Sequence, residues 1–492
     1  MFTLAAVLFT YSRASVIASP DQMVRPLLIL WGFLVLLAWP AFWIFHEWNR
    51  VGFALSFLAL LLYYPPDLFL IVSGILAIAF VAWLVYSFVR KRRLKILDAV
   101  VLLNITGIIL VIFELGAFAP LFYKAAFSVK SRPTPVALVA PDIRPDIYYI
   151  VLDGYAREDV LREFFNYDNS TFTNHLRSRG FIIPSENHSN YSKTAASLTS
   201  TLNMDYLQNI APDLNQTPFW WTVTPLLDHN AVAASLEGIG YRTVTIGTDW
   251  GITDIPSSDT YFRPYPVILT DYENYLLGAT PLKVLQPLLK SVASVPTNDT
   301  HRTFVRFSFD TLAVLPDLPG PKFVFAHILS PHPPFVFDAS GNPLERGYPF
   351  SFNDAMDFPG SRDQYKQDYV GQVEFINAQL EPVIEALLEN SEVPPIIILQ
   401  GDHGSGLLTD FSSADNTCLK ERFSPLAAYY LPGLESGDIP DDITPVNLFR
   451  IIFNKYFGAD LPLLENAEYF NKDSIYIFDT VDVSSRVDET CK

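Results

Sequence analysis

The sequence contains few charged residues and almost no cysteine. Asp, Glu, Lys and Arg make up 17% of its 492 residues, below the quarter that is usual in soluble proteins. Half of the residues are hydrophobic, which excludes an intrinsically disordered chain. Cys418 and Cys491 are the only cysteines, too few for a disulfide scaffold or a cysteine-based metal site. They could form one disulfide in an oxidising compartment, and the sequence leaves that bond open.

The charges are divided unevenly along the chain. Residues 1–130 hold 10 Lys and Arg against 5 Asp and Glu, a net charge of +5. Residues 131–492 hold 24 against 47, a net charge of −23. Together with a positive mean hydropathy, this division indicates one part in lipid and one in water. We expect no nucleic-acid partner, because the acidic part would repel phosphate backbones.

The first part predicts an all-α transmembrane bundle within residues 1–123. Apolar segments lie at 26–45, 51–66, 68–89 and 99–123, and a fifth, 1–18, is interrupted by Arg13. Helices of about 20 residues cross a hydrocarbon core of ~30 Å. We therefore expect about five spans. One acidic residue, Glu114, lies near the end of a span, where its carboxylate can reach the interface.

A basic cluster sets the expected orientation. Arg90, Lys91, Arg92, Arg93 and Lys95 lie in one short loop, and such loops face the cytoplasm. The following span then runs outward, so everything after residue 125 is expected outside the cytoplasm. The sequence thus predicts a multi-pass protein of the plasma (inner) membrane with an extracytoplasmic domain.

The remainder of the chain predicts a linker and an α/β domain. Residues 124–145 contain four prolines, each of which blocks helix continuation. In residues 146–492, apolar runs at 146–152, 241–246, 323–328 and 395–399 indicate buried parallel strands. Helical patterns lie between them at 157–165, 172–179, 225–236 and 369–388. This alternation predicts a sandwich with a mainly parallel sheet.

Polar residues follow these strands where ligands bind in open parallel sheets. Asp153 ends the first strand, and Asp402 and His403 follow the last. His327 and His332 lie on and after the third, and Thr194 stands at a predicted helix start. Carboxylate, imidazole and hydroxyl donors together suit a divalent ion such as Zn²⁺ or Mn²⁺.

Such an ion would activate the Thr194 hydroxyl, a weak nucleophile at neutral pH. The helix start beneath it would favour a phosphate or sulfate group, and the two histidines could hold its oxygens or protonate a leaving group. Taken singly, each residue has an ordinary structural explanation. Asp153 could belong to a turn, Thr194 could cap a helix, and His327 could be a hydrogen-bonded core residue.

The order of Asp153, Thr194, His327, His332, Asp402 and His403 resembles the alkaline phosphatase superfamily, in its sulfatase-like branch. A five-helix anchor before an extracytoplasmic catalytic domain is similar to lipoteichoic acid synthases and lipid A phosphoethanolamine transferases. The segment 329–335 resembles the first group, and the spacing of His327 and His332 resembles the second.

This resemblance implies an alkaline-phosphatase-like fold and one divalent metal ion, Zn²⁺ or Mn²⁺, bound by Asp153, Thr194, Asp402 and His403. Thr194 would take a phospho-substituent from a phospholipid headgroup and pass it to an acceptor, with His332 and His327 contacting the phosphate. The family more often has Glu at the position of Asp153, which leaves the choice of metal open. No second His follows His403 closely, so a two-metal site is not expected.

The sequence is compatible with three functions. The first is a membrane-anchored phosphotransferase acting on lipid-linked or envelope phosphodiesters. The second is a sulfatase-like hydrolase of phosphate or sulfate esters, although Thr194 lacks the Cys/Ser-x-Pro-x-Arg context that formylglycine-dependent sulfatases need. The third is a non-catalytic envelope-binding protein.

Overall fold

The computed structural model describes residues 2–16, 18–63, 96–128, 134–213, 215, 219–265, 269–289, 295–472, 476 and 478–491. The chain divides into two compact units. The first consists of Met1–Ala126 together with Tyr265–Val295, and the second of Phe127–Pro264 together with Pro296–Lys492. The domain boundaries expected at residues 123 and 145 stay predictions.

The first unit is helical. Its described elements are α1 (Phe2–Ala14), η1 (Pro20–Met23), α2 (Val24–Phe45), α3 (Trp48–Tyr63), most of α5 (Ile96–Ser128), α12 (Asp271–Ala279), η4 (Pro281–Leu285) and α13 (Gln286–Leu289). Among these residues one helical stretch, Pro20–Phe45, is long and apolar enough to cross a membrane. Its Leu36 and Ile44 are more than 70% exposed, an arrangement that suits lipid.

The structure describes most of the other expected spans, but not all of them. Segments 1–18, 51–66 and 99–123 coincide largely with α1, α3 and α5, and only a shorter apolar stretch, Asn104–Ala117, stands out within α5. Segment 68–89 and the basic cluster at 90–95 lie outside the described residues. The number of spans and their orientation therefore stay predictions.

An insertion from the α/β part of the sequence packs among these helices. Within the first unit, the Tyr272 hydroxyl lies 2.7 Å from Thr10 Oγ1 and donates to the carbonyl of Val7. Glu273 forms an ion pair with Arg25. Tyr272 is fully buried. The sequence pattern had placed this segment with the catalytic domain, because contacts between positions so far apart in the chain leave no local signal.

The second unit is built on a six-stranded sheet in the order β3-β2-β4-β1-β5-β6. The strands are β1 (Ile147–Leu152), β2 (Arg242–Ile246), β3 (Thr260–Phe262), β4 (Lys322–Ile328), β5 (Ile396–Gln400) and β6 (Ala427–Tyr430). All neighbours are parallel except β5 and β6. The predicted mainly parallel sheet is confirmed, and β1, β4 and β5 are its central strands.

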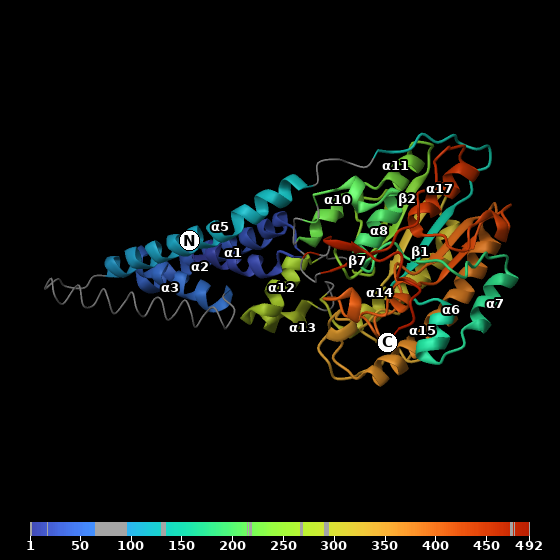
Figure 1. The fold of residues 1–492 in the computed structure, drawn as a ribbon. Helices are drawn as coiled ribbons and strands as arrows, with labels where there is room; N and C mark the ends of the chain where they lie inside the picture. The colour runs from blue at the N-terminus through green and yellow to red at the C-terminus, as the bar shows by residue number, and fades with distance from the viewer. Residues whose placement is uncertain are drawn as a thin grey trace. The chain divides into compact units, whose positions relative to one another are not determined.

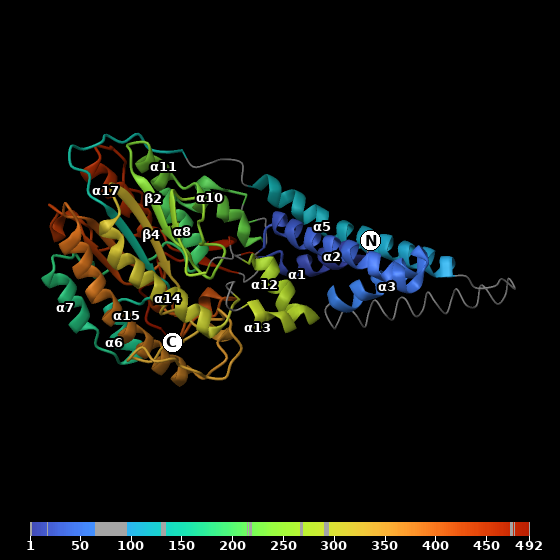
Figure 2. The ribbon, with the colours of Figure 1, turned by 180° about the vertical axis from the view of Figure 1, so that it is seen from behind.

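Helices cover both faces of this sheet, as Figures 1 and 2 show. One layer contains α8 (Thr194–Asn203), α10 (Thr224–Asp228), α11 (Ala231–Glu237) and α17 (Pro445–Tyr456). The other contains α6 (Glu158–Phe165), α7 (Ser170–Ser178), α14 (Asn298–Val314) and α15 (Arg362–Asn390). The side chains of β1 are buried along the whole strand, which explains its continuous apolar sequence.

The remaining described elements are short. They are α9 (Leu207–Ile210), α16 (Leu419–Phe423), the hairpin strands β7 (Tyr469–Asn471) and β8 (Thr480–Asp482), and the 3₁₀ turns η3 (Trp220–Val223), η5 (Leu315–Asp317), η6 (Ala355–Asp357), η7 (Ala414–Asn416) and η8 (Ser436–Asp438).

The prediction of one helix over 225–236 is wrong, because two helices, α10 and α11, occupy this segment. Asn230 interrupts it and caps α11 by accepting from the backbone N–H of Ala233. Asn favours this cap position, since its side chain replaces an intrahelical bond.

Candidate active site

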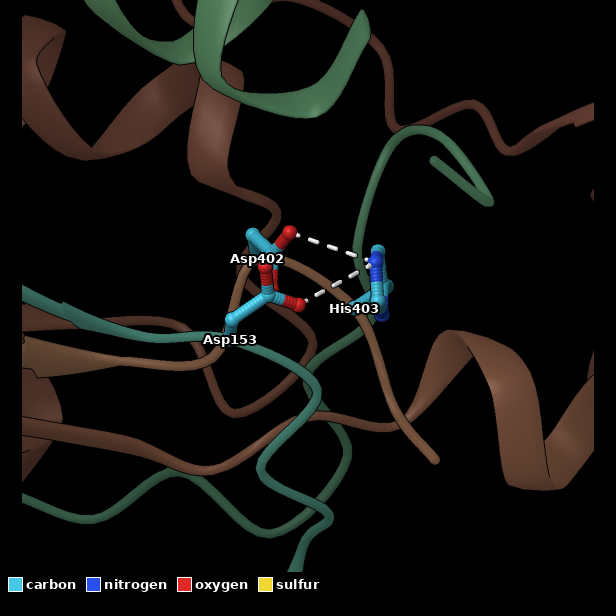
Figure 3. A group of neighbouring side chains, drawn as sticks. All are labelled: Asp153, Asp402 and His403. Carbon is cyan, nitrogen blue, oxygen red and sulfur yellow. Dashed lines mark ion pairs between the residues drawn. The ribbon is translucent and has the colours of Figure 1, made fainter. Parts of the chain in front are cut away.

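The ends of two strands, β1 and β5, bring two buried acids and one imidazole together. The side chains of Asp153, Asp402 and His403 offer ligand atoms that lie within 4.8 Å of one another. His403 Nε2 lies 3.2 Å from Asp402 Oδ2 and 3.7 Å from Asp153 Oδ1. Figure 3 marks both ion pairs with dashed lines. Because β1 and β5 are parallel neighbours, the residues that follow them meet at one edge of the sheet.

The turn after β1 positions Asp153. Its backbone N–H donates to the carbonyl of Ile328 on β4, and its carbonyl accepts from the N–H of His332. The next residue, Gly154, has a positive φ of 69°, a conformation that favours glycine. Its N–H donates to Asp402 Oδ1 over 3.0 Å, so the turn also orients the second carboxylate.

The turn after β5 orients His403. Its Nδ1 lies 2.9 Å from the carbonyl of Gly404, which assigns the Nδ1 proton to that bond and directs Nε2 toward the two carboxylates. A Cβ on Gly404 would lie 1.9 Å from the carbonyl oxygen of Glu421. Glycine is therefore required at this position, since any side chain would push the turn away from α16.

Thr194 is the first residue of α8, as the sequence predicted. Its Oγ1 lies 3.1 Å from His403 Nε2. The helix is attached to the turn after β5, because the Ser197 hydroxyl donates to the carbonyl of Asp402 over 2.7 Å. The hydroxyl thus lies beside the acids and the imidazole, at the positive end of a buried helix.

Each of the two histidines of the β4 region lies beside an acid. His327 Nε2 lies 3.3 Å from Asp153 Oδ2, and its Nδ1 lies 2.8 Å from Thr253 Oγ1. His332 Nε2 lies 3.8 Å from Asp354 Oδ2. His327 is fully buried and His332 is 13% exposed, so His332 is the more accessible to a substrate.

Sequence reasoning missed Arg422 and Asp354. The Arg422 side chain is 2% exposed and donates to Asp354 Oδ2 over 3.2 Å and to the carbonyl of Ser192 over 2.8 Å. Its Nη2 lies 3.1 Å from His403 Nε2. Neither residue follows a strand predicted from the sequence, and 68 positions separate them, so no local pattern marks them.

The charges around the cluster set the protonation of its members. Burial by itself would raise the pKa of Asp153, but the imidazoles of His332 and His327 lower it below its ordinary value. Burial and the Arg422 cation lower the pKa of His403. The cluster therefore contains an ionised carboxylate and a neutral imidazole, the forms in which these side chains bind metals.

The opposite shift occurs at His332. Burial would lower its pKa, but the carboxylates of Asp153 and Asp354 raise it above its ordinary value. The pKa of Asp354 is lowered. Burial would raise it, but the charges of His332 and Arg422 outweigh burial. His332 and Asp354 thus behave as an ion pair at the edge of the site.

The donor set fits a divalent metal ion. Asp153 Oδ1 and Asp402 Oδ2 are buried without a hydrogen-bond partner among the described residues. Two buried acceptors of this kind are costly unless a cation or donor compensates them. Carboxylate oxygens with one imidazole nitrogen are ligands that Zn²⁺ and Mn²⁺ accept. These three residues could hold a metal ion, and we name them the metal-binding cluster.

The part of the sequence that forms this site also identifies the protein family. Residues 145–455 match the profile of the sulfatase family. The chain belongs to the sulfatase family. This membership confirms the resemblance to the sulfatase-like branch of the alkaline phosphatase superfamily, and it covers the whole sheet and every residue of the cluster. No curated protein matches this sulfatase-family chain.

Several solved structures are similar to this sulfatase-family chain at low identity. The C-terminal periplasmic domain of EcEptC from Escherichia coli is 12% identical, with 73% of this chain and 98% of that chain covered and a TM-score of 0.43. Lipooligosaccharide phosphoethanolamine transferase A from Neisseria meningitidis, an integral membrane protein, is 12% identical over 82% and 68%, with a TM-score of 0.37. Phosphonate monoester hydrolase of Agrobacterium radiobacter is 13% identical over 66% and 80%, with a TM-score of 0.41. Likenesses at this level do not determine the activity of this chain.

Proposed function

We propose that this sulfatase-family protein is a membrane-anchored, metal-dependent phosphotransferase of the plasma (inner) membrane. It moves a phospho-headgroup from a lipid donor to an envelope acceptor through a covalent intermediate on Thr194. The observation that carries the proposal is the position of Thr194 Oγ1, 3.1 Å from His403 Nε2 in the buried cluster of Asp153, Asp402 and His403.

The residues of the site have distinct roles in this reaction. Asp153, Asp402, His403 and Thr194 would hold one divalent ion, Zn²⁺ or Mn²⁺. When bound, such an ion lowers the pKa of a hydroxyl ligand and neutralises phosphoryl charge. The N–H groups at the start of α8 favour the same charge, and His332, paired with Asp354, is assigned to the substrate phosphate together with His327.

The reaction is an exchange of phosphate esters. Thr194 Oγ1 forms a new bond to phosphorus, the bond between phosphorus and the lipid oxygen breaks, and that oxygen takes up the proton that Thr194 lost. An acceptor hydroxyl then replaces Thr194 at phosphorus, and its proton returns to the threonine oxygen. The apolar, lipid-suited surface of α2 supports a lipid donor, because an anchor raises the effective concentration of membrane substrates.

The test is intact-mass analysis of the full-length protein after incubation with phospholipid vesicles. We expect an added mass that maps to Thr194, its absence in Thr194→Ala, and its retention in Thr194→Ser. Thr199→Ala is the matched control, since this hydroxyl lies on the same helix but donates to the carbonyl of Ala195. An adduct on another residue would overturn the assignment of the nucleophile.

The same assay separates transfer from hydrolysis and from mere binding. A transferase keeps the adduct until an acceptor hydroxyl is supplied. Release of the headgroup phosphate to water at one rate, with or without an acceptor, would identify an ester hydrolase instead. A Thr194→Ala strain that keeps full cellular function would identify a binding protein.

A further inference from the structure

The insertion Tyr265–Val295 joins the N-terminal helices from within the catalytic part of the sequence. It leaves the second unit after β3 and returns to it before α14. The chain therefore passes between the two units at three places, after Ala126, after Pro264 and after Val295. A single connection is enough to anchor a domain, so the two further passages indicate a separate role for the insertion.

The insertion is attached at the N-terminal end of the candidate membrane span, Pro20–Phe45. The backbone N–H of Tyr272 donates to the side chain of Gln22 over 3.0 Å. Glu273 pairs with Arg25, which lies in the first turn of α2. Polar and charged side chains at the end of an apolar span lie at the level of the lipid headgroups. These contacts therefore hold the insertion at that level.

The segment after α12 exposes a group of apolar side chains. Val284 and Leu285, at the end of η4, are 70% and 41% exposed, and Leu288 on α13 is 73% exposed. Among the described residues of the second unit, no five consecutive positions hold three large apolar side chains as exposed as these. Such a group marks a surface that contacts a membrane or a partner.

The charge of this segment favours an anionic surface. From Asn274 to Val295 the sequence contains Lys283 and Lys290 but no Asp or Glu, although it belongs to the acidic part of the chain. Lys283 is exposed and directly precedes the apolar Val284. Lysine beside exposed apolar side chains is typical of segments that lie in the interface of a bilayer with anionic lipids.

We propose that Val284, Leu285 and Leu288 lie in the headgroup region of a bilayer that contains anionic phospholipid. The insertion is then a second membrane contact of the chain, which ties the catalytic unit to the lipid surface by two further passages. Lipid is favoured over a protein partner because the same unit already presents the exposed apolar side chains of α2. This inference rests on the membrane anchor of the proposed function and not on the reaction at Thr194.

The first test measures which solvent surrounds the segment. The full-length protein carrying Leu288→Cys is labelled with an environment-sensitive fluorophore and placed in nanodiscs of phosphatidylcholine and phosphatidylglycerol. The two native cysteines form a disulfide, so the label is specific. We expect strong quenching by lipids brominated near the headgroup and little by aqueous acrylamide, because interfacial segments insert about 5–10 Å into the headgroup boundary.

Val314→Cys is the matched control, since Val314 is 59% exposed at the end of α14 in the second unit. Its label should be quenched by acrylamide and not by brominated lipid. Acrylamide quenching of the Leu288 label as strong as that of the Val314 label would overturn the proposal. Protection from acrylamide without quenching by lipid would overturn it too, because a protein partner or a second copy of this chain would then cover the segment.

The second test concerns the charge. Lys283→Glu is expected to weaken lipid quenching of the Leu288 label in nanodiscs with phosphatidylglycerol and to leave it unchanged in phosphatidylcholine alone. Lys455→Glu is the control, because Lys455 is an exposed lysine of α17. Equal quenching in both variants would refute the role of anionic lipid. Failure of the mass assay at Thr194, beside lipid quenching of the Leu288 label, would reject the transfer reaction alone.

Discussion

Asp402 contributes to the site through both its side chain and its backbone. Its Oδ2 belongs to the metal-binding cluster, its Oδ1 accepts from the N–H of Gly154, and its carbonyl accepts from Ser197 on α8. One residue thus ties together the turn after β1, the turn after β5 and the helix that carries Thr194. Its buried Oδ2 has no hydrogen-bond partner among the described residues, and a bound cation would compensate its charge.

Substitution of either carboxylate of the metal-binding cluster is therefore expected to release the metal. Asp402→Asn or Asp153→Asn is expected to lower the bound metal of the purified full-length protein from one ion per chain to a small fraction, because a neutral amide is a poor ligand for Zn²⁺ or Mn²⁺. Elemental analysis by mass spectrometry measures this ratio. Asp410→Asn, on the same loop but bonded to Ser412 and Asn416, should keep its metal. Equal metal content in all variants would contradict the ligand assignment.

At the scale of elements, the C-terminal segment supports the helix α16, which carries Arg422. Cys418 and Cys491 form a disulfide with a Cα–Cα distance of 5.1 Å, which resolves the bond that the sequence left open. Next to it, Val483 and Val487 pack with Leu419 and Phe423 in a small apolar cluster. Cys418 immediately precedes α16, which contains Arg422, so the tail limits how far this helix can move from the site.

Removal of this disulfide should destabilise the protein. It closes a segment of 73 residues, and crosslinks of this kind contribute roughly 2–4 kcal/mol. We expect the double variant Cys418→Ser and Cys491→Ser to unfold at a lower temperature by differential scanning fluorimetry. A reductant should lower the midpoint of the unsubstituted protein and leave that of the variant unchanged. A reductant effect on both proteins would show that it acts elsewhere.

The insertion at Tyr265–Val295 is attached to the N-terminal helices through Glu273, among other contacts. Glu273 caps α12 together with Thr270 and also pairs with Arg25 on α2. Glu273→Ala removes both contacts and is expected to cost about 1–2 kcal/mol of local stability. Glu273→Gln keeps hydrogen-bonding capacity for the cap but not the ion pair, so its effect should be smaller. Limited proteolysis of the insertion in detergent would measure both, and equal cleavage of all three proteins would contradict the docking.

At the scale of the whole molecule, burial raises the pKa of two of its many acidic residues, Glu421 and Glu468. Burial raises the pKa of Glu421 to about 7, and the Ser405 hydroxyl that donates to it only partly offsets this. Burial likewise raises the pKa of Glu468 to about 7, and the negative charges of Asp482 and Asp488 raise it further. Both carboxyls hold a proton in the folded protein that they release near pH 4.5 when unfolded.

This linkage predicts lower stability at higher pH. Between about pH 4.5 and 7 the folded state binds more protons than the unfolded state, so stability falls as the pH rises. The contribution is fully present below pH 4.5 and is lost through pH 7, at roughly 3 kcal/mol at most for each carboxyl. Thermal unfolding at pH 5, 6, 7 and 8 should show a flatter dependence in Glu468→Gln. Exposed Glu465→Gln is the control, and identical slopes in both variants would refute the assignment.

Much of the site was predictable because of where its residues stand in the chain. Asp153, Asp402 and His403 directly follow buried apolar strands, and parallel strands end at one edge of a sheet. Thr194 begins a helix that enters the same edge. Arg422 and Asp354 could not be predicted, because Arg422 lies on the five-residue helix α16 and Asp354 on a loop, and neither has a periodic signal. Their contact with each other joins positions 68 residues apart.

The sequence by itself determined four of the six strands of the sheet, β1, β2, β4 and β5, together with the apolar N-terminal segments and the polar groups at the strand ends, because hydrophobic periodicity and chain order are local properties. Only the tertiary structure decided that Cys418 meets Cys491, that Tyr265–Val295 packs with the N-terminal helices, and that Arg422 lies beside His403. The physical reason is that such pairings follow from the packing of whole layers against the sheet, which leaves no trace in the spacing of the residues involved.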